Sequence, residues 1–107
     1  PGLKDILIKY IETLGTWKID HAANAADALL KLVNSQYDAV LADVFLPDME
    51  GFKFFKSLQS QTKNSILIMM SGKCNPTEAA VIRDECDCFL VKPFPLDELK
   101  AALEGSV

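Results

Sequence analysis

Three short apolar runs, each followed by a polar residue, constrain the fold of this chain most strongly. The pairs of run and polar residue are 39–42 with Asp43, 66–70 with Ser71, and 89–91 with Lys92. Short runs that are apolar on both faces are typical of parallel strands buried between layers of helices. The carboxyl ends of parallel strands meet at one edge of a sheet, so we expect a carboxylate, a hydroxyl and an ammonium group to converge there. Such a set of groups favours the acceptance of a phosphoryl group.

Segments with helical periodicity alternate with short strands along the whole chain. The predicted strands are residues 17–22, 39–43, 65–70 and 88–91, and the predicted helices are residues 3–14, 25–33, 52–58, 77–85 and 96–104. Strict alternation of this kind predicts an α/β fold with a parallel sheet covered by helices on both faces. Gly15 is suited to end the first helix, and Asn24 is suited to cap the second.

Composition limits the class of protein. The chain has 107 residues, of which 50% are hydrophobic and 24% charged, as expected for one domain. The net charge of −4 argues against direct binding of nucleic acid by this domain. No apolar stretch approaches the roughly 20 residues of a membrane span. The three cysteines, Cys74, Cys86 and Cys88, form no zinc-binding pattern and indicate a reducing compartment, which we expect to be the cytoplasm.

Motifs on three strands and one loop resemble a known family. They are Asp43, Pro47 and Gly51 in LADVFLPDMEGF, Ser71-Gly72 after ILIMM, and Lys92-Pro93 in FLVKPF. In this order and spacing the chain resembles the CheY-like receiver domain of two-component response regulators, from residue 1 to about Leu103. The resemblance implies a single receiver domain over residues 1–107. It also implies a flavodoxin-like, doubly wound parallel sheet of strand order 2-1-3-4-5.

The chain departs from the family pattern at its beginning. The family starts with a strand that ends in an acidic pair, whereas this sequence starts at the first helix. We therefore expect strand 1 to be absent from this sequence. It lies upstream of residue 1, or another copy fills its place, or the chain is a degenerate member that folds differently. Without that strand, residues 17–22 and 39–43 each lose a hydrogen-bonding neighbour, which is costly and invites association.

The resemblance implies a role for each polar residue at the sheet edge. Asp43 would be the phosphoacceptor, Lys92 would pair with the phosphoryl oxygens, and Ser71 would donate its hydroxyl once Asp43 is modified. Phe89 would be the aromatic switch that turns inward as Ser71 moves. The bond that precedes Pro93 would be a cis peptide.

The resemblance also implies a metal and two residues that tune the phosphate lifetime. Mg²⁺ would be held by the Asp43 carboxylate and the Phe45 backbone carbonyl, together with the acidic pair that is not present in the sequence. Phe45 and Lys73 would set how long the phosphate survives. Because Phe45 is bulky and apolar, it would hinder an attacking water, and we expect slow self-dephosphorylation.

Two functions from different classes remain open. The first is a phosphorylation-controlled switch, supplied by a histidine kinase or phosphotransfer protein, that changes its helix 4, strand 5 and helix 5 face to control a fused or docked output domain. Its chemistry is limited to self-phosphotransfer and self-dephosphorylation, so conventional enzymatic turnover is not predicted. The second is a pseudo-receiver, an interaction module that takes no phosphate. A homodimer, with partners docked on the same face, is also compatible with the sequence.

Overall fold

The computed structural model describes residues 3–15, 17–44, 48–72 and 76–104. Helices and strands alternate in this part of the chain, apart from the first two helices, which follow one another. The elements are α1 Leu3–Thr13, α2 Ala25–Asn34, β1 Ala39–Asp43, α3 Gly51–Gln61, β2 Ile66–Ser71, α4 Pro76–Glu85, β3 Cys88–Val91 and α5 Leu96–Leu103.

The strands form one parallel sheet in the order β1-β2-β3. Asp43 lies opposite Met70 between the first two strands, and Ser71 lies opposite Val91 between the last two. β2 is central, and its residues after Ile66 are all buried, because both of its edges are paired and both of its faces are covered. The predicted α/β class and parallel sheet are therefore confirmed.

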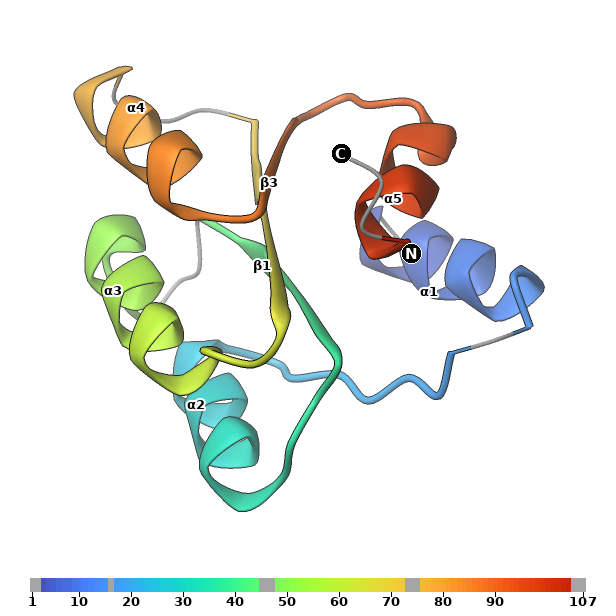
Figure 1. Ribbon diagram of the computed structural model, residues 1–107, viewed down its shortest axis with the longest axis horizontal. Coiled ribbons are helices and arrows are strands. Elements are labelled where there is room, and N and C mark those ends of the chain that lie inside the picture. The colour runs from blue at the N-terminus through green and yellow to red at the C-terminus, as the bar shows by residue number, and fades with distance from the viewer. Residues whose placement is uncertain (1–2, 16, 45–47, 73–75, 105–107) are drawn as a thin grey trace.

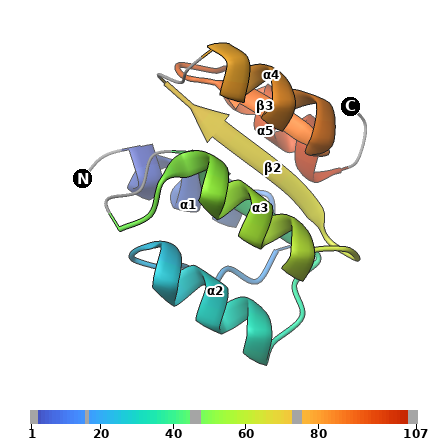
Figure 2. The same cartoon turned by 90° about the vertical axis from the view of Figure 1, so that its left-hand side faces the viewer.

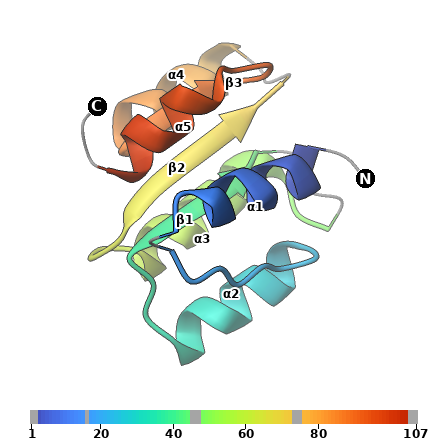
Figure 3. The same cartoon turned by 90° about the vertical axis from the view of Figure 1, so that its right-hand side faces the viewer.

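Helices cover both faces of the sheet (Figure 1). α2, α3 and α4 lie on one face (Figure 2), and α1 and α5 lie on the other (Figure 3). Neighbouring residues of β2 point to opposite faces, so Met69 packs in the first layer and Ile68 in the second. Phe54 and Phe55 of α3 are almost completely buried in the first layer. Burial of a side chain of this size stabilises the fold by roughly 1.5–3 kcal/mol.

Residues 17–22 do not form the strand that the sequence predicts. A strand requires backbone partners, and among the described residues no backbone hydrogen bond joins residues 17–22 to β1. The alternation of apolar and polar side chains predicted an extended segment. It does not show whether another strand lies beside the segment to pair with it. The described sheet thus holds three strands, which match the last three positions of the predicted order 2-1-3-4-5.

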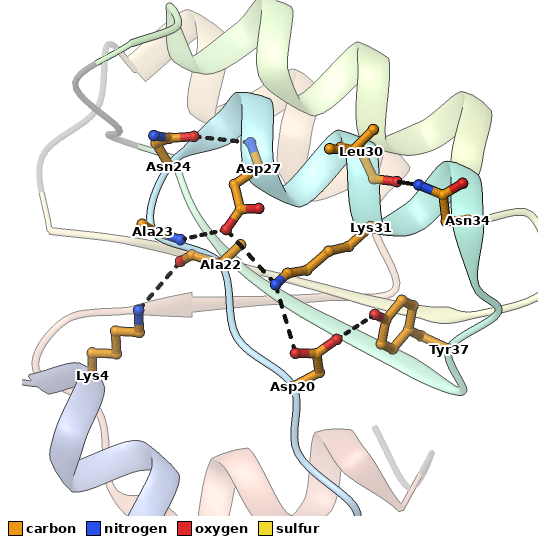
Figure 4. A network of polar contacts seen from close by, with 10 residues as sticks. All are labelled: Lys4, Asp20, Ala22, Ala23, Asn24, Asp27, Leu30, Lys31, Asn34 and Tyr37. Carbon is orange, nitrogen blue, oxygen red and sulfur yellow. Dashed lines mark hydrogen bonds and ion pairs between the residues drawn. The ribbon is translucent and has the colours of Figure 1, made fainter.

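Side-chain contacts, rather than backbone pairing, hold the segment before α2 (Figure 4). The Nζ of Lys4 in α1 donates to the Ala22 carbonyl at 3.2 Å. The hydroxyl of Tyr37 donates to the Asp20 carboxylate at 2.6 Å. This bond lowers the pKa of Asp20 and raises the pKa of Tyr37. These side-chain contacts hold the segment, while among the described residues its backbone forms no hydrogen bond with β1.

The helix ends follow the sequence signals. Gly15 has a φ of 74°, and its N–H donates to the carbonyl of Glu12 at 3.1 Å, so a left-handed glycine ends α1 as expected. The Asn24 side chain accepts from the Asp27 N–H at 2.9 Å and caps α2 as expected. Boundaries differ from the predicted ones by a few residues, most at α3, which runs on to Gln61. Among the described helices, none has the length and hydrophobicity that a membrane span requires.

Candidate functional site

The carboxyl edge of the sheet brings Asp43 and Lys92 together. The Lys92 Nζ donates to the Asp43 carboxylate, and each side chain is about one quarter exposed. The contact joins the end of β1 to the residue after β3, across the full width of the described sheet. The backbone N–H of Lys92 donates to the Ser71 carbonyl at 2.9 Å, which extends the β2–β3 pairing up to this point. Three residues far apart in the sequence therefore meet at one edge.

Ser71 contributes a buried hydroxyl to this edge. The residue is 3% exposed, and its Oγ has no hydrogen-bond partner among the described residues. A buried hydroxyl without a partner costs free energy, because it gave up its hydrogen bonds to water on folding. The Ser71 side chain is therefore ready to donate to an acceptor that arrives at the edge.

Phe89 lies on the face of the sheet that carries Ser71. It pairs with Met69 in the register of β3 against β2, and Ser71 is two residues beyond Met69. Its ring is partly buried against the core layer of α2, α3 and α4. The guanidinium carbon of Arg83 in α4 lies 4.9 Å from the centre of the ring. Sequence reasoning missed Arg83, because its contact depends on how α4 packs over β3.

Asp48 binds the start of α2 through its side chain. Its two carboxylate oxygens accept from the N–H groups of Ala25 at 2.9 Å and Ala26 at 3.0 Å. These hydrogen bonds, that of Ala26 foremost, lower the pKa of Asp48. Sequence reasoning missed this role too, since an acidic loop residue gives no sign that its partner lies more than twenty positions earlier.

Gly51 brings α3 against the end of β1. A Cβ atom at this position would lie 2.5 Å from the Val44 carbonyl oxygen and 2.7 Å from Val44 Cγ1. Val44 is held in turn, because its N–H donates to the Met70 carbonyl at 2.8 Å. Only a residue without a side chain allows this approach, so Gly51 fixes the helix start next to the residue that follows Asp43.

Several of the predicted site features can be located only in part. The peptide bond between Lys92 and Pro93 is cis, the isomer that the resemblance implied. Phe45, Pro47 and Lys73 lie outside the described residues.

The described residues do not by themselves fit a magnesium ion. In the described ranges, no three His, Cys, Asp or Glu side chains gather as a metal ion would need. Asp43 supplies one carboxylate, whereas Mg²⁺ requires near-octahedral oxygen coordination. The two described cysteines offer no alternative: burial raises the pKa of the Cys88 thiol and raises that of Cys86 to about 11.

A cavity of about 390 Å³ separates residues 17–24 from β1 and reaches Asp43 and Lys92. The Asp38 carbonyl and the Val44 N–H both bond toward β2. In a strand, the N–H and C=O groups of successive residues point to opposite edges. Leu41, an odd-numbered residue between Asp38 and Val44, therefore turns its N–H and C=O toward the cavity. The cavity is thus a slot between two extended segments, with its far end at the candidate site.

Comparisons with known proteins agree on one family. The family model of the response regulator receiver domain matches residues 1–104. The chain is 28% identical to the response regulator Rre1 of Synechocystis sp. over 98% of its own length and 47% of that protein. It is 34% identical to the transcriptional regulatory protein TcrA of Mycobacterium tuberculosis over 81% of its length and 35% of that protein. The chain therefore spans less than half of these curated relatives.

Solved structures show the same fold. A two-component response regulator from Clostridium difficile matches with a TM-score of 0.84 and 23% identity, over 96% of this chain and 84% of that chain. The response regulator TrrA from Thermotoga maritima, in complex with Mg²⁺–BeF, matches with a TM-score of 0.76 and 24% identity, over 98% and 92%. Both likenesses support the CheY-like receiver architecture predicted from the sequence.

Proposed function

Since the chain belongs to the family of response regulator receiver domains, we propose that it is a phosphoacceptor switch that takes a phosphoryl group on Asp43. One observation carries the proposal: the Asp43 carboxylate and the Lys92 ammonium are in contact at the carboxyl edge of the sheet. The buried Ser71 hydroxyl, without a described partner, supports it from the adjacent strand. A nucleophile, a fixed cation and a free donor are the groups that phosphoryl transfer needs.

Each residue has a defined task in the transfer. A carboxylate oxygen of Asp43 attacks the phosphorus of a phosphorylated histidine, and the phosphorus–nitrogen bond breaks as its electron pair returns to the imidazole. The product on Asp43 is an acyl phosphate. Lys92 moves from the carboxylate to the phosphoryl oxygens, and Ser71 donates its hydroxyl to one of them. Phe89 then turns inward and alters the face formed by α4, β3 and α5.

We propose that the slot beside β1 accommodates a first strand. We place there a strand that precedes residue 1 in the natural protein and bonds to β1 on one side and to residues 17–22 on the other. Its carboxyl end would lie beside Asp43, where carboxylates could complete the oxygen ligands that the described residues lack. We propose a Mg²⁺ site only if this strand and the Phe45 carbonyl supply further oxygen ligands, because the Asp43 carboxylate alone does not form a metal site.

The partners follow from the same assignment. A histidine kinase or phosphotransfer protein supplies the phosphoryl group, and an output domain, fused or docked, reads the altered face. The relatives support a fused domain, because the chain matches only 47% of Rre1 and 35% of TcrA. A homodimer through the same face is a further arrangement. Phe45 and Lys73 set the phosphate lifetime in this proposal.

The test is intact-mass measurement of the natural protein before and after treatment with acetyl phosphate and Mg²⁺. We expect a gain of one phosphoryl group, lost in Asp43→Ala and retained in Asp38→Ala. Asp38 is a matched control, because it is an exposed aspartate at the other end of β1. No gain in a folded wild-type protein would instead favour the pseudo-receiver, which the single carboxylate at the described edge also suits.

A further inference from the structure

We propose that Arg83 is a latch: its contact with Phe89 favours the conformation of the unphosphorylated state. Arg83 would thereby set how readily the domain changes to its phosphorylated conformation. The inference rests on the proposed function. It concerns a contact between α4 and β3 that the phosphoryl chemistry itself does not require. Arg83 is the only arginine of the chain, and its guanidinium carbon lies 4.9 Å from the centre of the Phe89 ring. This distance is within the range of a cation–π contact.

The surroundings of Arg83 make the ring its main partner. Arg83 is exposed, and its guanidinium forms no ion pair or hydrogen bond with a described residue. The carboxylate of the neighbouring Glu85 binds α3 and not Arg83, because it accepts from Lys56 at 2.7 Å and from Gln59 at 3.1 Å. Glu85 therefore anchors the end of α4 to α3, which keeps Arg83 positioned over the strand.

α4 has little else to hold it against β3. Ile82 is its only buried residue in the described part of the helix. Ile82 and Phe89 both pack into the same core layer. Arg83 adds a contact to the Phe89 ring, which the core covers only in part. An inward turn of Phe89 would remove the ring from the reach of Arg83, so the contact is made in one of the two states only.

A contact made in only one state shifts the balance toward that state. An exposed cation–π contact corresponds to roughly a two- to five-fold change in an equilibrium constant. Arg83 therefore opposes activation by about this factor. It is a positioning residue, because it touches neither the phosphoryl group nor Asp43.

The experiment measures the affinity of the natural protein for beryllofluoride with Mg²⁺, in wild type, Arg83→Met, Arg83→Lys and the control Lys100→Met. Methionine keeps the apolar stem and removes the charge. Lys100 is an exposed cation on α5, on the opposite face of the sheet. We expect Arg83→Met to bind roughly two- to five-fold more tightly, Arg83→Lys to lie between it and wild type, and Lys100→Met to match wild type.

A double-mutant cycle with Phe89→Leu separates the latch from a purely structural contact. Unfolding free energies should show coupling between Arg83 and Phe89 without beryllofluoride and no coupling with it. Equal coupling in both conditions, or unchanged beryllofluoride affinity in Arg83→Met, would overturn the latch while leaving the proposed function intact. Failure of the wild-type protein to bind beryllofluoride would overturn the proposed function, and the latch with it.

Discussion

At the scale of single residues, one acidic side chain, that of Asp48, joins parts of the chain that are distant in sequence. Asp48 accepts from both Ala25 and Ala26, while Asn24 accepts from Asp27. The first N–H groups of α2 are therefore satisfied by two different segments. The carboxylate of Asp48 also lies at the positive end of the helix, where a negative charge is favourable. Asp48 is thus fixed to the start of α2 by charge and by hydrogen bonds.

This geometry predicts a pH dependence for Asp48→Asn. The pKa of Asp48 is held below its ordinary value of 3.8. A carboxyl with a lowered folded-state pKa stabilises the protein above its unfolded-state pKa, and that contribution is lost as the pH falls through the folded-state value. Asp48→Asn should therefore be less stable than wild type at pH 7, and the difference should shrink below about pH 4.

Urea unfolding midpoints between pH 7 and pH 3 measure this difference. Asp38→Asn is the control, because Asp38 is an exposed aspartate for which the structure gives no capping bond. A difference between wild type and Asp48→Asn that stays constant over the whole range would contradict the role of the carboxylate charge.

At the scale of elements, the start of α3 is fixed by its approach to β1. Glu50 caps the helix, and its carboxylate accepts from the N–H groups of Phe52 at 3.0 Å and Lys53 at 3.3 Å. The next residue, Gly51, leaves no room for a side chain against Val44. The start of α3 is consequently set by the Glu50 cap and by the close approach of Gly51 to Val44.

Gly51→Ala should destabilise the protein. The added methyl group would meet the Val44 carbonyl at 2.5 Å, so either α3 or the end of β1 must shift. Overpacking of this kind costs about 1–3 kcal/mol in the free energy of unfolding. Gly72→Ala is the matched control, because its nearest neighbour would be Lys92 Cδ at an ordinary 3.7 Å. Denaturant unfolding of both variants tests the expectation, and equal stabilities would refute it.

At the scale of the whole molecule, a slot lies between β1 and the segment before α2. A covering helix layer lies on both faces, yet β1 and residues 17–22 are separated by a cavity of about 390 Å³. Open edges of strands are sites of association. The completed sheet of the proposed function therefore depends on a strand that enters this slot.

Hydrogen exchange of backbone amides should report the filled slot. The Leu41 N–H points into the slot, whereas the neighbouring Ala42 N–H points toward β2. In the natural protein we expect slow exchange at both residues. In a polypeptide of residues 1–107 alone we expect Leu41 to exchange much faster than Ala42. Equally slow exchange at Leu41 in the two polypeptides would contradict the placement of a strand there.

Much of the fold could be predicted from the sequence, because local patterns carry it. Helical periodicity and caps located the five described helices, and the strands at residues 39–43 and 88–91 have the predicted bounds. The convergence of Asp43 and Lys92 also followed from the sequence, because the carboxyl ends of parallel strands share an edge. These inferences needed only the polarity and the spacing of the side chains along the sequence.

Tertiary structure alone decided which groups have partners. Residues 17–22 have the alternation of a strand but form none, since a strand exists only where a neighbour offers hydrogen bonds. The pairs of Asp48 with α2 and of Arg83 with Phe89 join elements that packing brings together. The unsatisfied Ser71 hydroxyl likewise results from burial in three dimensions. Sequence pattern fixes which face a side chain takes, whereas only the packed chain determines what that side chain meets.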